Sequence, residues 1–345
     1  MKCKTFHSTP YVTMPEIILV FRKPNTTSNS IEFLFHHIHD ELKDRVRITE
    51  VVLPRLSQGF LNRVYNTIQL LRYRKRAVHI TGDVHYALLG ALFSKRILTI
   101  HDLSFLSRTS GIRRRILSLF WVYLPARLAH RITVVSEATR KALMQEVNID
   151  PSKVRVIHNF VHPIYKPVER QFNSACPRIL QIGTSFNKNL ENLVRALDGM
   201  SCVLVIIGSL SEKQEKLLSE CRVNYIQISA LTLEQMHEEY VKADLLSFVS
   251  IIEGFGLPVL EAQATGLPVL TSNCSSLPEV AGAGALMVDP FSVADIRDGI
   301  IEISTNSLKR KELIRAGYEN AAKFEMKKIA EAYLTIYREE LFPQS

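Results

Sequence analysis

The sequence predicts an α/β protein made of two doubly wound domains, each with a parallel sheet covered by helices. Short apolar runs alternate with helix-like periods almost throughout the chain, which is typical of parallel sheets buried on both faces. The chain has 345 residues, more than one hydrophobic core usually supports, so two domains are expected. Its 46% apolar and 22% charged residues are ordinary for a globular protein.

Twelve runs are predicted as strands, six in each half of the chain. The first six are EIILVF (16–21), RITEVVL (47–53), AVHITG (77–82), RILTIHD (96–102), RITVVSE (131–137) and VRVIHN (154–159). The second six are PRILQIG (177–183), CVLVIIG (202–208), NYIQIS (224–229), ADLLSFVS (243–250), LPVLTS (267–272) and ALMVDP (285–290). We expect one domain over residues 1–165 and a second over 166–326, joined near HNFVHPIYKPVE.

Helix starts are predicted from capping residues. Ser136 opens SEATRKALM, Ser211 opens SEKQEKLL with Gln214 three residues on, and Thr232 opens TLEQMHEEYVKA. Ligands in open α/β sheets bind beyond the carboxyl ends of the strands, so the loops that follow the twelve runs are where a site is expected.

The charges of the chain are unevenly distributed. Residues 1–165 hold 25 Lys and Arg against 11 Asp and Glu, while the remainder holds 18 against 23. A basic half favours anionic partners such as a membrane surface or phosphorylated ligands. No nucleic-acid module and no early G-x-G-x-x-G are present, so neither nucleic-acid binding nor dinucleotide oxidoreduction is expected.

Cysteine usage and hydropathy indicate the compartment. The five cysteines lack disulfide or zinc-ligand spacing, which indicates reduced thiols. No apolar run reaches the roughly 18 residues of a spanning helix, and the first residues lack a signal-peptide core. A cytoplasmic protein is expected.

The pentapeptide GLPVL occurs twice, at residues 256–260 and 266–270, and the two copies predict different structures. In the first copy, Pro258 stands in the first turn of a helix that runs to about Thr265. In the second copy, Gly266 ends that helix in a left-handed conformation. The turn Gly254–Leu257 then presents backbone N–H groups at a helix N-terminus, an arrangement suited to phosphate.

Two acids flank this turn, Glu253 before it and Glu261 in the helix. A carboxylate accepts hydrogen bonds from two vicinal hydroxyls, and such charge-assisted bonds contribute roughly 1.5–3 kcal/mol each. A phosphate cradle between two acids that bind diols predicts a nucleotide sugar, with ribose on one side and a hexose on the other.

The stretch EGFGLPVLE, residues 253–261, resembles the E-x7-E signature of retaining GT-B glycosyltransferases, specifically glycosyltransferase family 4. TIHDLSF, RITVVSEATRKAL, KVRVIHNFVHPIY, LQIGTSFNKNLENLVRAL and ATGLPVLTSNCSSLPEVAGAGALMVDP are similar to that family in the same order, over roughly residues 95–300. The resemblance implies the GT-B architecture, two Rossmann-like domains facing across a cleft. The first domain would bind the acceptor and the second the donor, and the final helix, 327–345, would pack back on the first.

The resemblance also implies roles for the residues of the signature. Glu253 would contact hydroxyls of the transferred sugar, and Glu261 would hold the ribose. Backbone amides between them would take the sugar and the phosphates, from Gly254, Phe255, Gly256 and Leu257.

The segment QIGTSFNKNLENL resembles the family's diphosphate-binding loop. Its expected donor-binding residues are Gly183, Thr184, Lys188 and Asn189, and Lys188 would neutralise charge that develops on the departing nucleotide. Thr184 and Asn187 stand where the family often carries arginine, so the backbone amides are expected to take more of the diphosphate. A solvated surface lysine is the alternative for Lys188.

His101 ends a first-domain strand, and the resemblance implies that it reaches the donor sugar or the leaving group. A histidine buried in the core is the alternative. With Glu253 it is the expected catalytic residue. The chain contains no D-x-D, so neither a metal nor a cofactor is expected, and the donor would be a UDP-, GDP- or ADP-sugar.

Residues 111–131 combine three arginines, Arg113, Arg114 and Arg115, with a strongly apolar stretch that holds Trp121. As an interfacial helix this segment would set the arginines over anionic headgroups and Trp121 at the lipid boundary. A buried core helix is the alternative. With the basic first half, this favours a lipid-linked saccharide or a lipopolysaccharide-type acceptor at the inner face of the cytoplasmic membrane. Residues 25–30 replace a glycine-rich loop of the family and are a candidate contact for acceptor or donor phosphate.

Two rival functions remain. A nucleotide-sugar 2-epimerase on the same architecture would bind the same donor but need no acceptor, so incubation with donor alone separates the two. A non-catalytic nucleotide-sugar-binding partner of another transferase is the second rival. The presence of Glu253, Glu261 and Lys188 argues against it.

Overall fold

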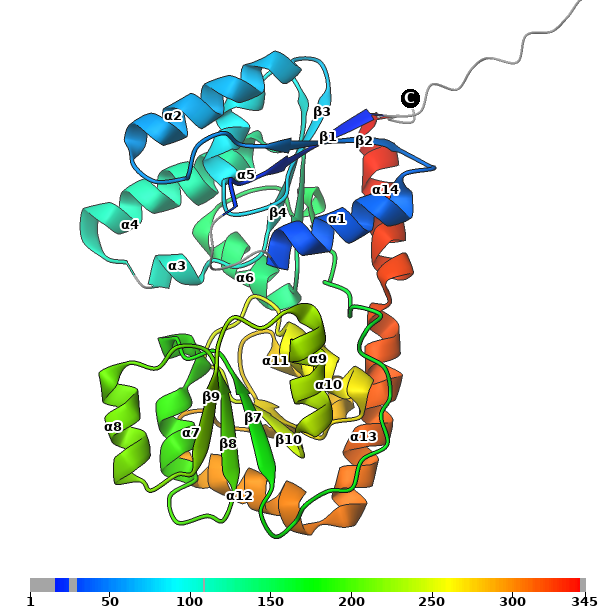
Figure 1. Ribbon diagram of the computed structural model, residues 1–345. Coiled ribbons are helices and arrows are strands. Elements are labelled where there is room, and N and C mark those ends of the chain that lie inside the picture. The colour runs from blue at the N-terminus through cyan, green and yellow to red at the C-terminus, as the bar shows by residue number, and fades with distance from the viewer. Residues whose placement is uncertain (1–15, 25–29, 108, 342–345) are drawn as a thin grey trace, which may run out of the picture.

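The computed structural model describes residues 16–24, 30–107 and 109–341, and these ranges form two parallel six-stranded sheets. The first sheet has the order β2-β1-β3-β4-β5-β6 and the second β12-β11-β10-β7-β8-β9. Each strand lies within one residue of a run predicted from the sequence. The predicted α/β fold with two doubly wound sheets is therefore confirmed (Figure 1).

The strands are short, as expected for buried parallel sheets. Those of the first sheet are β1 (Glu16–Phe21), β2 (Arg47–Val52), β3 (Ala77–Ile80), β4 (Lys95–Ile100), β5 (Arg131–Val134) and β6 (Val154–Val156). Those of the second are β7 (Arg178–Ile182), β8 (Val203–Ile207), β9 (Tyr225–Ile228), β10 (Leu245–Phe248), β11 (Val269–Ser272) and β12 (Leu286–Val288).

Helices follow most strands. Those of the first half are α1 (Ser30–Leu42), α2 (Phe60–Gln69), α3 (Ser104–Ser107), α4 (Gly111–Leu117), α5 (Leu124–Leu128) and α6 (Glu137–Glu146). Those of the second half are α7 (Leu190–Ala196), α8 (Glu212–Glu220), α9 (Leu233–Lys242), α10 (Leu257–Thr265), α11 (Leu277–Ala281), α12 (Val293–Thr305), α13 (Ser307–Ala321) and α14 (Met326–Leu341).

Each sheet has a hydrophobic core on both faces. In β1, Ile18 and Val20 belong to one cluster while Ile17, Leu19 and Phe21 belong to another, because successive side chains of a strand point to opposite faces. The second sheet likewise separates two clusters. Helix α14 packs against α1 in the first-sheet core, so the chain returns to the sheet where it began (Figure 1).

The predicted helix caps are confirmed. The Ser136 hydroxyl accepts from the Thr139 amide at the start of α6, and Ser211 and Gln214 form a reciprocal capping box on α8. Thr232 opens α9 in the same way with Gln235. These bonds satisfy amides that the first helical turn leaves without intrahelical partners.

The strand orders fix where ligand loops meet. In the second sheet β7 is central, with β10 on one side and β8 on the other, so the chain changes direction between β7 and β10. In the first sheet the change lies between β1 and β3. A crevice forms at the carboxyl ends of strands where the order reverses, so the loops after β7 and β10 are brought together.

Candidate active site

The loops after β7 and β10 bring Lys188 and Glu253 into contact, although the two residues are 65 positions apart. The Lys188 Nζ donates to the Glu253 Oε1 at 2.7 Å, and the side chains are 20% and 13% exposed. Both are accessible without being solvated on all sides. Lys188 is therefore no freely solvated surface lysine, because its partner is a second residue predicted for the same site.

Gly183 supports this lysine. The residue has a φ of +85°, and a Cβ at this position would lie 2.9 Å from the Lys188 Cγ. The lysine stem therefore lies flat on the glycine backbone, and its ammonium group sits 4.5 Å from the centre of the Phe248 ring. The absence of a side chain at position 183 is what lets the cation reach Glu253.

The two copies of GLPVL adopt the two predicted structures. Gly256 precedes α10 with a φ of +116°, and Pro258 stands in the first turn. Gly266 ends the same helix with a φ of +73°. The N-terminus of α10 therefore follows directly on Glu253–Gly256, as the anion-binding interpretation of this turn requires.

The turn also contacts the first domain. A side chain at position 254 would bring its Cβ to 2.0 Å from the carbonyl oxygen of His101, so Gly254 permits an approach that no other residue allows. The Gly254 carbonyl accepts hydrogen bonds from the Ser136 hydroxyl at 2.7 Å and the Thr139 hydroxyl at 3.2 Å. Ser136 is thus both a helix cap and an interdomain contact, and sequence reasoning identified only the cap.

A second contact between the domains lies beside the first. The Glu279 carboxylate of α11 accepts from the Glu137 amide at 2.9 and 3.0 Å, at the N-terminus of α6, and pairs with His158 at 2.7 Å. These bonds hold the pKa of Glu279 below its usual range, although burial opposes the shift. No feature of the sequence had singled out Glu279 or His158.

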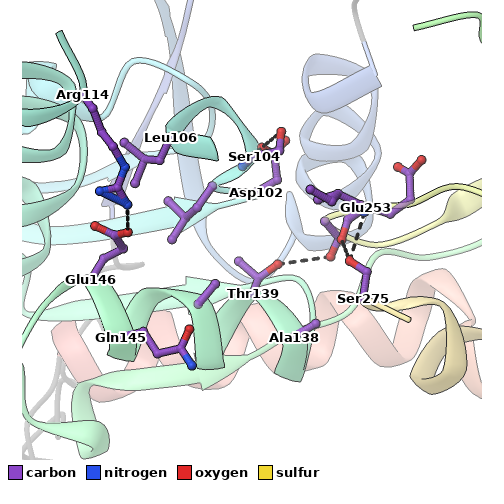
Figure 2. A pocket seen from close by; sticks show the side chains of 14 residues that line it. Asp102, Ser104, Leu106, Arg114, Ala138, Thr139, Gln145, Glu146, Glu253 and Ser275 are labelled. Atoms are coloured by element: carbon purple, nitrogen blue, oxygen red, sulfur yellow. Dashed lines mark hydrogen bonds and ion pairs between the residues drawn. The ribbon is translucent and has the colours of Figure 1, made fainter. Parts of the chain in front are cut away.

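Glu253 and Gly254 line two small cavities between the domains. One, of about 260 Å³, has His101, Asp102 and Asn159 on its first-domain side. The other, of about 230 Å³, extends past Thr139 to Arg114 (Figure 2). Figure 2 shows Glu253 and Ser275 at one end of this second cavity and the Arg114–Glu146 ion pair at the other.

His101 lies where a ligand in the first cavity would meet it. Its Nε2 is 2.8 Å from the Thr81 carbonyl, which only accepts, so Nε2 carries the proton and Nδ1 is the acceptor nitrogen. Burial lowers the pKa of His101, although nearby carboxylates oppose the shift. His101 is thus a neutral imidazole at the cleft and not a core histidine, because it lines the cavity opposite Glu253.

Glu261 is not among the residues that line either cavity. Its Oε2 accepts from the Tyr240 hydroxyl at 2.5 Å, and Tyr165 bonds the same carboxylate. Burial raises the pKa of Glu261 to about 7, although the tyrosine hydrogen bonds lower it. The sequence placed Glu261 in free contact with ribose, whereas the structure gives it two tyrosine partners that come from elsewhere in the chain.

Two of the side chains predicted to bind the donor form hydrogen bonds with backbone carbonyls of the protein itself. Asn189 is 4% exposed, and its amide donates to the carbonyls of Val249 and Pro290 at 3.1 and 2.7 Å. Both N–H groups of this side chain therefore join backbone segments and are not free to bind a donor, and a donor contact from the rest of Asn189 stays a prediction. Thr184 donates to the Ser209 carbonyl at 2.6 Å, which fixes the loop after β7.

Phe255 and Leu257 contribute side chains to the packing between the domains. Phe255 is 5% exposed and lies in a cluster with Val135, Val280 and Phe324. Leu257 packs against the same cluster and lines the 260 Å³ cavity. Phe255 also lines that cavity, and the donor contact expected of its backbone amide stays a prediction.

The segment 111–131 is helical, but it is neither one regular helix nor uniformly exposed. Helix α4 passes into a π-helical turn, Ser118–Tyr123, and then α5. Trp121 turns inward, where its indole N–H donates to the Asp83 carbonyl at 3.0 Å and its ring lies 4.8 Å from Tyr86. Trp121 is therefore half-buried in the first domain, and its position at a lipid boundary stays a prediction.

The three arginines of this segment separate. Arg113 lines a cavity of the first domain, Arg114 pairs with Glu146, and Arg115 is exposed. Residues 25–29 of the predicted phosphate-contact loop lie outside the described residues. None of the helices in the described ranges has the length and apolarity that crossing a membrane requires.

Two family models match the chain, one on each half. The model "Glycosyltransferase Family 4" matches residues 26–164, and "Glycosyl transferases group 1" matches residues 168–320. The chain is a glycosyltransferase.

Solved structures share the fold of this glycosyltransferase. Anabaena HepE in complex with UDP and glucose superposes with a TM-score of 0.76 at 12% identity, over 93% of this chain and 99% of HepE. WaaG, a glycosyltransferase involved in lipopolysaccharide biosynthesis, gives 0.72 at 16% identity, over 95% and 100%. The glycosyltransferase therefore has the GT-B architecture that the sequence predicted.

A curated relative is similar in sequence over part of its length. The O-antigen chain mannosyltransferase RfbU of Salmonella typhimurium is 24% identical over 210 residues, which are 58% of this chain and 58% of RfbU. The chain thus matches less than two thirds of that relative. The two family models carry the assignment to the glycosyltransferases, and RfbU and WaaG are similar proteins named for O-antigen and lipopolysaccharide synthesis.

Proposed function

We propose that this glycosyltransferase moves a hexose from a nucleoside-diphosphate sugar to a lipid-linked saccharide or lipopolysaccharide-type acceptor, at the cytoplasmic face of the membrane. The observation that carries the donor half of this proposal is the Lys188–Glu253 pair at the switch point between β7 and β10. A cation for the diphosphate and an acid for the sugar hydroxyls meet where α/β sheets bind ligands. The acceptor class is supported by the similarity to RfbU, an O-antigen chain mannosyltransferase, and to WaaG, a glycosyltransferase involved in lipopolysaccharide biosynthesis.

Donor binding would exchange the partners of this pair. The Lys188 ammonium leaves Glu253 for the diphosphate, and the freed Glu253 carboxylate accepts hydrogen bonds from hydroxyls of the hexose. Lys188, Gly183 and the N-terminus of α10 would then surround the leaving group with positive potential. Because Lys188 and Glu253 are already largely withdrawn from water, these two side chains lose little further hydration when the donor arrives.

The bonds broken and formed in the proposed transfer, and the proton that moves, are accounted for by the donor and the acceptor alone. The bond from the anomeric carbon to the phosphate oxygen breaks, and a bond to the acceptor oxygen forms on the same face, so the configuration is retained. The acceptor hydroxyl proton passes to the departing phosphate oxygen. The Nε2–H of His101 donates to the Thr81 carbonyl, so the Nδ1 lone pair is left to accept a hydrogen bond from a hydroxyl of the donor sugar.

Thermal-shift screening of the native chain against UDP-, GDP- and ADP-sugars identifies the donor, because a ligand of the folded state raises the melting temperature. The donor found in this way is then incubated with the chain, with and without a lipid-linked saccharide acceptor. Acceptor-dependent release of the nucleoside diphosphate is the expected result. Formation of an epimer from donor alone, with no effect of acceptor, would instead establish the 2-epimerase.

A further inference from the structure

An open apolar groove of about 450 Å³ crosses the first domain between α2 and the α4 segment. Phe60, Val64 and Ile68 of α2 form one wall, and Ile116 of α4 and Phe120 of the π-helical turn form the other. Phe60, Ile68 and Ile116 are 76%, 54% and 52% exposed. Apolar side chains this exposed on two facing helices form a contiguous patch of the kind that marks a binding surface.

A larger cavity of about 620 Å³, called the polar cavity here because charged residues such as Arg22 and Asp83 line it, shares the wall residues Arg63 and Trp121 with the groove. On its far side this cavity shares Asp83 and Asp102 with the cavity that holds His101 and Glu253. The polar cavity therefore shares wall residues with both the groove and the catalytic cleft, and it connects the two in sequence.

The junction between the groove and the polar cavity carries unneutralised positive charge. The Arg63 guanidinium lies 4.4 Å over the Trp121 ring and donates to the Ser57 carbonyl at 3.3 Å, while its buried Nε has no hydrogen-bond partner. Arg113 lines the polar cavity but not the groove, and within the described ranges neither Arg63 nor Arg113 forms an ion pair with an acid. An anion at this junction would supply the missing partner, and arginine suits phosphate because of its planar fork of donors.

His85 adds an unpaired polar group to the same cavity wall. The residue is 2% exposed, and its Nδ1 is 2.9 Å from the Trp121 carbonyl, which only accepts. The proton is therefore on Nδ1, and the buried Nε2 is an acceptor without a partner. A buried polar atom in this state is expected to bind a hydroxyl of a ligand.

We propose that the groove binds the single hydrocarbon chain of an isoprenoid phosphate, and that Arg63 and Arg113 bind its phosphate. The linear order of apolar groove, cationic junction and catalytic cleft matches the order of chain, phosphate and saccharide in such a lipid. His85 then accepts from a hydroxyl of the attached saccharide. The inference rests on the proposed function for its acceptor class, and it assigns the residues that hold that acceptor.

The chain's single tryptophan reports directly on this site, because Trp121 lines both the groove and the polar cavity. Farnesyl phosphate, kept below its aggregation concentration, is titrated into the full chain while tryptophan emission is recorded. Saturable quenching or a spectral shift is expected. Geranyl phosphate, five carbons shorter, should bind at least about tenfold more weakly, since each buried methylene contributes about fourfold in affinity.

Two variants of α2 separate the groove from general surface hydrophobicity. Ile68→Glu places a charge in the groove wall, and Leu61→Glu places the same charge at a 77% exposed position of the same helix that lies outside the groove. We expect the dissociation constant for farnesyl phosphate to rise at least about tenfold in the first and to stay within about twofold in the second. Equal losses in both variants would show bilayer-type adsorption to the whole face and overturn the inference.

The variant Arg63→Met tests whether Arg63 binds the phosphate group of the lipid. The variant keeps an apolar stem over Trp121, so farnesol should bind as well as to the native chain, while the advantage of farnesyl phosphate over farnesol disappears. Inorganic phosphate alone should leave the emission unchanged at the same concentrations. An undiminished preference for the phosphate in Arg63→Met contradicts the assigned junction, as does a farnesyl phosphate titration that never saturates or that only drives the chain to self-associate.

The failure of this inference is distinguishable from failure of the proposed function. Nucleoside diphosphate release measured with a saccharide acceptor that lacks a lipid tests transfer without the groove. Transfer to that acceptor with no farnesyl phosphate binding overturns the groove alone. Groove-specific binding without any transfer supports the groove and overturns the proposed function.

Discussion

The two sides of the cleft are built in different ways. On the second domain, Lys188, Glu253 and the start of α10 come from two adjacent loops, and glycines hold those loops in place. On the first domain, the walls around Trp121 come from several separate helices and loops. A site that rests on local backbone geometry leaves a sequence motif, whereas a site made by tertiary packing leaves only scattered apolar and basic residues.

The largest expected effect concerns the donor side. Lys188→Met removes the cation beside Glu253 and the diphosphate, and we expect kcat/KM to fall about 10²–10³-fold, as when one preorganised charge stabiliser is lost. Lys216→Met, at a surface lysine paired with Glu220 on the same domain, is the matched control and should leave the rate unchanged. If the activity of Lys188→Met stays within about threefold of that of the native chain, Lys188 has no role in transfer and is an ordinary surface lysine.

The second effect compares two glycines of similar backbone conformation. Gly266, in the second GLPVL, has a φ of +73°, and a Cβ there would lie 2.0 Å from the Tyr318 hydroxyl. Gly59 of the first domain has a φ of +72° with open space around it. We expect Gly266→Ala to lower the free energy of unfolding by about 2–4 kcal/mol and Gly59→Ala by about 1 kcal/mol.

Denaturant unfolding of both variants measures this difference. Equal losses would mean that the left-handed conformation alone sets the cost and that Tyr318 yields to the added methyl group. The steric contact with Tyr318 would then add nothing measurable to the cost of a side chain at position 266.

The third effect is a dependence on pH through Glu261. The pKa of this carboxyl is raised to about 7 in the fold, so between its unfolded value and about pH 7 the native state holds a proton that the unfolded chain has lost. Stability should therefore fall as pH rises through that window, by up to about 1.4 kcal/mol per pH unit. Glu261→Gln should lack this contribution to the slope.

Donor affinity should change in the opposite direction. A ribose diol needs the ionised carboxylate as acceptor, so the affinity of the best nucleotide should rise between about pH 6 and pH 8. In Glu261→Gln this rise should be absent. A native-like pH profile of nucleotide binding in the variant would remove Glu261 from the donor site.

The smallest effect compares two serine caps. Ser136 and Ser211 each accept from a helix amide, but only Ser136 also donates to the Gly254 carbonyl of the other domain. Each change to alanine should cost about 1 kcal/mol of stability. Only Ser136→Ala should also slow transfer, by about tenfold, and equal activity in the two variants would assign Ser136 to capping alone.

The sequence predicted the fold well because its signals are local. Each of the twelve strands falls on a short, mostly apolar run of the sequence, and Gly256, Pro258 and Gly266 fix both ends of α10. Lys188 and Glu253 were identified from motifs of the same kind. Their ion pair was not predicted, because it depends on β7 and β10 being neighbours.

The remaining features depend on partners distant in the chain. Glu261 looked like a free acid because Tyr165 and Tyr240 are 96 and 21 residues away from it. Asn189 looked like a donor ligand because its carbonyl partners belong to Val249 and Pro290. The partner of Trp121 could not be predicted because its indole N–H donates to the Asp83 carbonyl, which is 38 residues away in the chain.

The central claim is that the ion pair between Lys188 and Glu253 separates on donor binding, so that Lys188 binds the diphosphate and Glu253 binds the hexose. A crystal structure of the complex with the sugar nucleotide that most raises the melting temperature tests it most directly. The account predicts a diphosphate oxygen about 3 Å from the Lys188 Nζ and hexose hydroxyls at a similar distance from the Glu253 carboxylate. A nucleotide bound elsewhere, with Lys188 still paired to Glu253, would contradict it.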